Sequence, residues 1–172
     1  MQVKWEVVKP ADRGLIRSIA NQIHLPEIVA QILVNRGIDT SRAAQLFFGG
    51  KTKDLYDPFL MNDMDIAVDR VISALQKQEK IIIHGDYDVD GITAVSMLYL
   101  FLRDLGGQVS YYIPDRQQEG YGLSIAGIEE SHRWGASLII SVDCGITSTT
   151  EVELARKLGI DAIISDHHEP GA

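Results

Sequence analysis

Three aspartates occupy alternate positions in the stretch HGDYDVDGIT, and their carboxylates would repel one another unless a cation lay among them. These are Asp86, Asp88 and Asp90. Further groups of the same chemical kind occur downstream. These are Asp143, in SVDCG, and the run Asp166, His167 and His168. Carboxylate and imidazole together form a ligand set that suits Mn²⁺, Mg²⁺ or Zn²⁺, so the residue types predict a divalent-metal site.

The number of these groups points to hydrolysis of phosphoesters. Four or more ligands suggest two ions about 3.5–4 Å apart, an arrangement that activates water and stabilises the leaving oxygen. An EF-hand also opens with D-x-D-x-D-G, but counting from Asp86 its twelfth position is Met97, where that loop needs a bidentate glutamate. A phosphate-binding glycine loop before Gly91 is disfavoured, because three acids there would repel a phosphate.

From Lys80 onward, short apolar runs alternate with helical segments. We expect strands at 81–83, 109–113, 138–142 and 162–165. Between them we expect helices at 91–105, after a Ser124 cap, and after an S-x-x-E capping box formed by Ser148 and Glu151. Strands recurring about every 27 residues with a helix between them are typical of βαβ units. The sequence therefore predicts an α/β fold with a doubly wound parallel sheet.

The candidate ligands all follow strands, at the edge where open α/β sheets bind ligands. If the sheet has the order 2-1-3-4, the first, third and fourth strands are neighbours and their three groups of polar residues converge. We therefore expect one site at the carboxyl edge of the sheet.

The first 60 residues lack the alternation of strands and helices, and their pattern of short helices and loops predicts a helical arm. One helix is expected from Pro26 until Gly37, and a second from a Thr40 cap to Gly49. A longer helix opening at Asn62 or Asp63 then leads into the alternating region. We predict a helical arm over 1–60 and an α/β domain over 61–172.

Composition limits the possible partners and cellular location of the protein. The 172 residues are 45% hydrophobic with a net charge of −8, which weighs against coating nucleic acid by bulk charge. The single cysteine excludes an internal disulfide and fits a cytoplasmic location. The start has no apolar signal-peptide core, and the apolar run 92–102 is too short to span a bilayer, so we expect no membrane association.

The motif Asp-His-His, together with the earlier D-x-D and Asp143, resembles the DHH phosphoesterase superfamily. Within it, QILVNRGID, DLYDPFLMNDMDIAVDRVISAL and YYIPDRQQEGYGLS are similar to the bacterial single-strand-specific exonucleases. The resemblance implies hydrolysis of single-stranded DNA from the 5′ end in recombination and repair, with two Mn²⁺ (or Mg²⁺) ions. It also implies single-strand-binding protein and a RecQ-type helicase as partners.

The resemblance implies roles for individual residues. Asp88 and Asp90 match the paired aspartates, Asp143 the bridging carboxylate and His167 the metal-binding histidine. His168 would lie beside the phosphate, with Asp166 orienting both histidines. Further metal candidates are His84, four residues before Asp88, and Asp86. Candidate contacts to DNA are Arg116, Tyr121 and Gly122.

The family's core continues past the DHH motif with another aspartate ligand and further domains, whereas this sequence stops four residues after His168. We therefore expect an N-terminal part of a longer enzyme that by itself binds metal weakly and has little nuclease activity. The alternatives are an oligonucleotide or cyclic-dinucleotide phosphodiesterase or a pyrophosphatase of the same superfamily, or a non-catalytic binding module.

Overall fold

The structure is a computed structural model that describes residues 4, 6, 8 and 11–170. It divides into two compact units, Met1–Leu60 and Met61–Ala172, and each is described by itself. Within the described residues, no helix combines the length and apolar character that crossing a membrane requires.

The first unit is helical. It contains α1 (Arg13–Ile23), α2 (Glu27–Asn35), α3 (Ser41–Gly49) and the short 3₁₀ turns η1 (Thr52–Asp54) and η2 (Pro58–Leu60). The predicted helices after Pro26 and Thr40 are confirmed, and the Thr40 hydroxyl accepts a hydrogen bond from the amide of Ala43 at 3.2 Å. Helix α1 was not predicted individually, although Asp12 caps it by accepting from the amide of Leu15.

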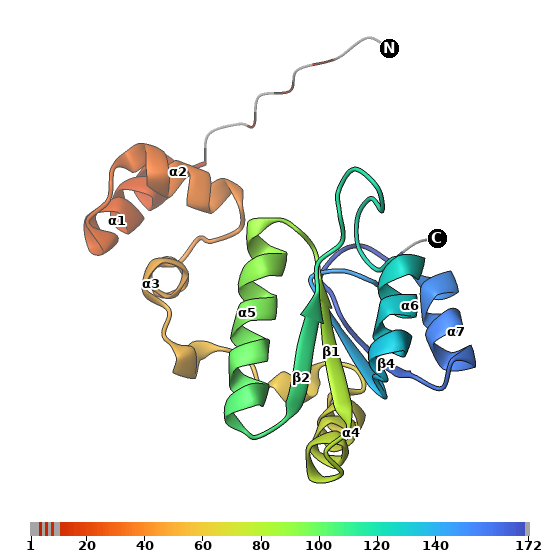
Figure 1. Ribbon diagram of the computed structural model, residues 1–172. Helices are drawn as coiled ribbons and strands as arrows, with labels where there is room; N and C mark the ends of the chain where they lie inside the picture. The colour runs from red at the N-terminus through yellow and green to blue at the C-terminus, as the bar shows by residue number, and fades with distance from the viewer. Residues whose placement is uncertain (1–3, 5, 7, 9–10, 171–172) are drawn as a thin grey trace. The chain divides into compact units, whose positions relative to one another are not determined.

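The second unit alternates helices and strands, as Figure 1 shows. Its elements are α4 (Met64–Gln76), β1 (Lys80–Gly85), α5 (Val89–Asp104), β2 (Gln108–Tyr112), α6 (Ile125–Trp134), β3 (Leu138–Val142), α7 (Thr149–Lys157) and β4 (Asp161–Ser165). The four strands pair in parallel in the order β2-β1-β3-β4, through three pairings, which confirms the predicted sheet.

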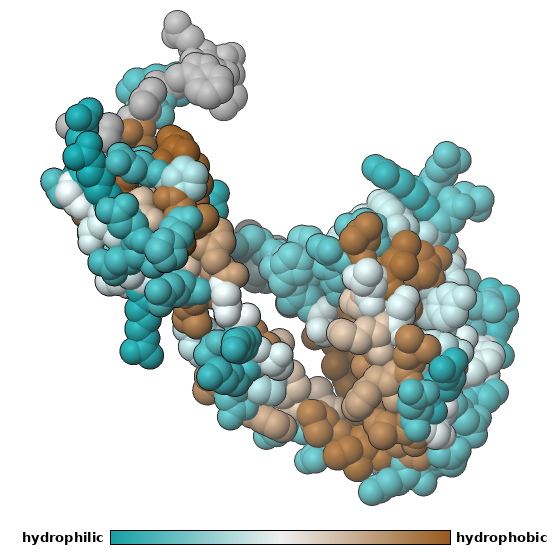
Figure 2. Space-filling model, turned by 90° about the vertical axis from the view of Figure 1, so that its left-hand side faces the viewer, coloured by the Kyte–Doolittle hydropathy of each residue, from teal (hydrophilic) through white to brown (hydrophobic). Residues whose placement is uncertain are grey.

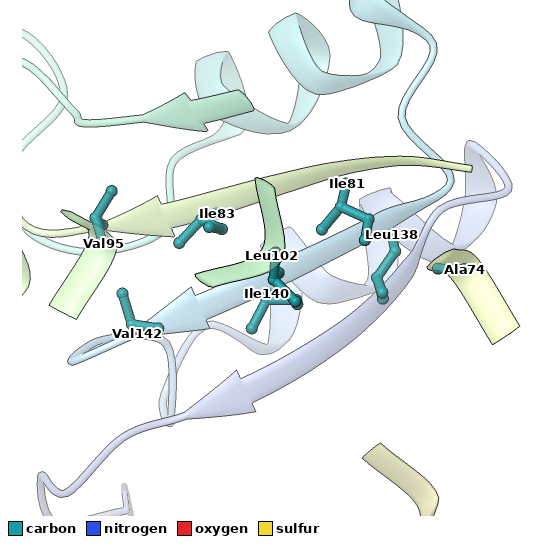
Figure 3. Packing of buried hydrophobic residues seen from close by; sticks show 8 residues of the cluster. All are labelled: Ala74, Ile81, Ile83, Val95, Leu102, Leu138, Ile140 and Val142. Atoms are coloured by element: carbon teal, nitrogen blue, oxygen red, sulfur yellow. The ribbon is translucent and has the colours of Figure 1, made fainter. Parts of the chain in front are cut away.

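Helices cover both faces of the sheet, as a doubly wound fold requires. On one face, side chains of β1 and β3 pack against α4 and α5 (Figure 3). The buried members of this cluster are Ala74, Ile81, Ile83, Val95, Leu102, Leu138, Ile140 and Val142. On the other face, Ile82 and Ile139 pack with Ile128 of α6 and Ala155 of α7. Successive side chains of a strand alternate between these two layers.

Two local predictions differ from the structure. Helix α5 begins at Val89 rather than Gly91, because Asp88 caps it. The capping box expected at Ser148 and Glu151 is wrong: Ser148 precedes α7 but its hydroxyl makes no capping hydrogen bond. The Ser148 backbone, with φ −84° and ψ 53°, is outside the extended conformation in which a capping side chain usually reaches the first turn.

Apolar side chains also reach the surface. Helix α5 exposes Val89, Met97 and Phe101, each with more than half of its area accessible. Hydrophobic residues are accordingly visible on the surface in Figure 2.

Candidate metal centre

The turn from β1 into α5 holds its aspartates through backbone contacts. The Asp88 carboxylate accepts hydrogen bonds from the amides of Asp90 and Gly91, both at 3.0 Å, and Asp90 lies exposed in the first helical turn. Acidic groups at this position also interact favourably with the positive end of the helix dipole. A side chain at position 91 would come within 2.5 Å of the Asp86 carbonyl oxygen, so the close turn requires glycine there.

Asp86 is the most deeply buried of the three, with only 1% of its area exposed. Its Oδ1 atom has no hydrogen-bond partner among the described residues. A buried carboxylate oxygen without a donor is unfavourable unless a cation or water reaches it. Asp86 therefore fits a charged site better than a purely structural position.

Asp143 stands directly beyond β3, with its backbone in the left-handed region at φ 60°. The Asp143 amide donates to the carbonyl of Ser165 at 2.9 Å, which extends the pairing of β3 with β4 by one residue. The Asp143 carboxylate lies 3.0 Å from Nε2 of His167. The segments after β3 and β4 therefore meet through these two side chains.

The Asp166 carboxylate organises the segment after β4. Its Oδ1 atom accepts from the amides of His167 and His168 and lies 2.7 Å from Nδ1 of His168, while Oδ2 accepts from the amide of Ile146. Burial opposes ionisation of Asp166, but these hydrogen bonds outweigh it and lower the pKa of the carboxyl. The hydrogen bond to Asp166 is also the main reason that the pKa of His168 is raised.

Asp143, His167 and His168 each place one possible ligand atom within 4.8 Å of the others, and we refer to this candidate group of three residues as the metal centre. An open cavity of about 500 Å³ lies beside it. The cavity walls bring Asp90 of α5 together with Asp143, Asp166 and His167. Sequence segments far apart in the chain thus converge at the carboxyl edge of the sheet, where they were expected.

His84 lies at the carboxyl end of β1 but outside this group of ligand atoms. Its side chain is fully buried on the α6 face of the sheet, and its Nε2 is 3.2 Å from the carbonyl oxygen of Gly122. Burial lowers the pKa of His84 to about 4, so the ring is neutral and donates this hydrogen bond. The group of ligand atoms found among the described residues does not include His84, and one of its two nitrogens is already engaged by protein.

Two of the candidate DNA-contact residues lie in the loop between β2 and α6 and next to the metal centre. The Tyr121 hydroxyl donates to the carbonyl of Asp143 at 3.0 Å and lies 3.2 Å from Nδ1 of His168. Gly122 follows with φ 84°, a conformation that favours glycine, and its carbonyl faces His84.

Arg116, in the same loop, stacks 5.3 Å above the ring of Tyr87. The interpretation of the sequence missed Tyr87 and also Glu119, which anchors this loop. Tyr87 is not a metal-ligand type, and Glu119, although a carboxylate, does not directly follow a strand as the candidate ligands do, so neither was singled out.

The residues around this cavity have side chains of the kinds that bind divalent cations. Carboxylate oxygens and imidazole nitrogens surround one cavity, and a buried Asp86 oxygen lacks a donor. Asp90 lines this cavity from the α5 side, and Asp143 and His167 line it from the side of β3 and β4. Asp88 is not among the lining residues, and its carboxylate caps α5.

The comparisons with known proteins agree with this geometry. The N-terminal domain of the DHH family matches residues 80–172, and the chain belongs to this family. Over 99% of the chain it is 46% identical to the single-stranded-DNA-specific exonuclease RecJ of Bacillus subtilis, and it covers 22% of that relative. The chain thus spans about a fifth of the length of this curated relative.

Two solved structures carry the same resemblance. A crystal structure of RecJ from Thermus thermophilus in complex with Mn²⁺ matches 98% of this chain with a TM-score of 0.70 and 25% identity, over 23% of that chain. An exonuclease RecJ bound to manganese matches 62% of this chain with a TM-score of 0.58 and 38% identity, over 28% of that chain. The predicted superfamily, and the likeness to its single-strand-specific exonucleases, are confirmed.

Proposed function

We propose that this chain is the N-terminal part of a metal-dependent exonuclease that hydrolyses phosphodiester bonds of single-stranded DNA. The observation that carries the proposal is the convergence of Asp90, Asp143, Asp166 and His167 around one cavity at the carboxyl edge of the sheet. The likeness to RecJ supports the substrate class. Polarity from 5′ to 3′, and a role in recombination and repair, are proposed from the family resemblance alone.

The cofactor is proposed as two Mn²⁺ or Mg²⁺ ions, which would activate water and offset charge on the leaving oxygen. The two similar structures of RecJ are described as binding manganese. A ligand set of carboxylates and imidazoles suits this ion. Asp88 and Asp90 would each hold one ion, Asp143 would bridge them and His167 would complete the set. Asp86, whose buried Oδ1 atom has no partner among the described residues, is a further candidate ligand. His84 packs against Gly127 of α6 and donates to the Gly122 carbonyl, so we propose that it supports the fold rather than a metal.

The remaining residues would position the substrate. His168, fixed by Asp166 through Nδ1, would present its other nitrogen to a phosphate oxygen. Arg116 carries a positive charge beside the acidic turn and would contact the DNA backbone, while Tyr121 and Gly122 would border the strand. Single-strand-binding protein and a RecQ-type helicase are proposed as partners from the resemblance alone.

We also propose that residues 1–60 form an arm and residues 61–172 an incomplete catalytic domain, so that this chain alone is nearly inactive. Three grouped ligand residues are fewer than two ions require, which supports weak metal binding. Calorimetric titration of the isolated chain with Mn²⁺ tests this. Two tight sites would contradict it.

The deciding experiment uses the full-length protein with Mn²⁺. It is offered 5′-labelled and 3′-labelled single strands, duplex DNA, dinucleotides and pyrophosphate, with Asp90→Ala as the matched inactive variant. Release of mononucleotides from the 5′ end of single strands is expected. Preference for dinucleotides or pyrophosphate would favour the other phosphoesterases, and full activity in Asp90→Ala would refute the proposal.

A further inference from the structure

A carboxylate outside the metal centre ties down the loop that carries Tyr121. We propose that Glu119 is a positioning residue: it holds the loop between β2 and α6 so that the Tyr121 hydroxyl stays in contact with the metal centre. The expected effect on catalysis rests on the proposed function, but the effect of Glu119 on the conformation of the loop can be measured separately.

Glu119 joins both ends of this loop. Its Oε2 atom accepts hydrogen bonds from the hydroxyls of Tyr112, at 2.8 Å, and of Ser124, while Oε1 accepts from the amide of Asp115 at 2.8 Å. Tyr112 ends β2, and Ser124 is the cap of α6, whose hydroxyl in turn accepts from the amide of Gly127. One side chain therefore connects a strand end, a loop start and a helix start.

The contacts of Glu119 favour its ionised form. Burial opposes ionisation, but the hydrogen bonds from Ser124, the Asp115 amide and Tyr112 outweigh burial and lower the pKa of the Glu119 carboxyl. Hydrogen bonds to an ionised acceptor are roughly twice as strong as neutral ones. Three donors on one carboxylate therefore make a firm anchor.

His84 supplies a second anchor on the other side of Tyr121. Its ring donates to the carbonyl of Gly122, the residue directly after the tyrosine, and lies 5.1 Å from the ring of Tyr112. At Gly127 of α6, a side chain would come within 2.5 Å of the His84 ring, so helix and ring are closely packed. Tyr121 is thus held between Glu119 and Gly122.

The held tyrosine reaches the metal centre. Its hydroxyl donates to the carbonyl of Asp143 and contacts the ring of His168. In Figure 1 the loop after β2 rises beyond the carboxyl ends of the strands before the chain returns into α6. Removing the Glu119 carboxylate would let Tyr121 move away from Asp143 and His168 without removing any proposed metal ligand.

The catalytic test is a double-mutant cycle in the full-length protein, measuring kcat and KM on a 5′-labelled single strand with Mn²⁺. We expect Glu119→Ala and Tyr121→Phe each to lower kcat about tenfold, and the double variant to be no slower than Tyr121→Phe, because both changes remove the same contact. Glu119→Gln, which can still accept from the Asp115 amide, should recover part of kcat. The matched control is Glu129→Ala, an exposed glutamate on α6. Effects on kcat that multiply in the double variant would overturn the proposal.

The test of loop conformation requires neither bound metal nor nuclease activity. Amide hydrogen exchange of the segment 113–124 should be faster in Glu119→Ala than in wild type, and unchanged in Glu129→Ala. If Glu119→Ala does not fold, Tyr112→Phe removes one of the same hydrogen bonds and should shift exchange and kcat in the same direction. Faster exchange in a protein that cleaves no DNA would refute the proposed function alone. Unchanged exchange would refute the role of Glu119 alone.

Discussion

His84 and the pair His167–His168 lie at the same edge of one sheet but in opposite environments. His84 is the fifth residue of β1, and strand alternation turns its ring toward α6, where it is fully buried. His167 and His168 lie beyond β4, outside the alternation, and their rings face Asp143 and Asp166. Residue type and strand position alone therefore do not decide where a side chain lies; the face on which it emerges matters equally.

The largest effect is expected on the exposed side of this comparison. Asp143→Asn keeps the shape of the side chain but removes the charge that faces His167, and a divalent ion depends on that charge. We expect the rate on single-stranded DNA to fall by about 1,000-fold or more in the full-length protein, with weaker Mn²⁺ binding by calorimetry. The matched control is Asp104→Asn at the far end of α5, which should retain full activity. Activity in Asp143→Asn close to wild type would break the assignment.

On the buried side, His84→Ala should act on stability rather than on metal binding. The change leaves a cavity against Tyr112 and removes the donor to the Gly122 carbonyl, so the free energy of unfolding should fall by about 2–4 kcal/mol. Urea denaturation measures the loss, and His132→Ala on the exposed side of α6 is the control. A loss of Mn²⁺ affinity without a loss of stability would instead make His84 a ligand.

The pH dependence of stability sharpens the same contrast. Burial lowers the pKa of His84 to about 4, so between pH 6.5 and 4 the unfolded chain takes up a proton that the folded chain does not. Stability from this residue is therefore complete above pH 6.5 and decreases by roughly 3 kcal/mol as the pH falls to 4. Urea denaturation at several pH values should show a flatter profile for His84→Ala than for wild type. Equal slopes would contradict the burial of a neutral ring.

The smallest effect is expected at Arg116. Arg116→Ala should raise KM for single-stranded DNA several-fold and reduce the slope of log affinity against log salt by about 0.7, because one phosphate contact is lost. Arg103 is a matched control, since it also stacks on a tyrosine, Tyr99, but on the opposite end of α5. Binding measured by fluorescence anisotropy at several salt concentrations checks both. Equal losses in the two variants would indicate a non-specific charge effect.

Much of the fold follows from local pattern. Apolar runs such as 81–83, separated by helix-length segments, predicted a parallel sheet, and the strand order 2-1-3-4 followed from requiring three polar clusters to converge. Caps at Thr40 and Ser124 were recognisable, because a hydroxyl before a helix has a specific local partner. The capping box predicted at Ser148 and Glu151 was wrong, because a capping side chain requires a backbone conformation that Ser148 does not adopt.

The sequence by itself determined the chemical character of the site, because aspartates and histidines placed after buried strands of a parallel sheet must share one edge. Only the tertiary structure decided which of them face one another. Side-chain alternation turned His84 away, and contacts between distant segments brought Asp143 to His167 and Tyr121 to Asp143. Glu119 became visible only there as well, since its partners span a strand, a loop and a helix cap that no sequence spacing relates.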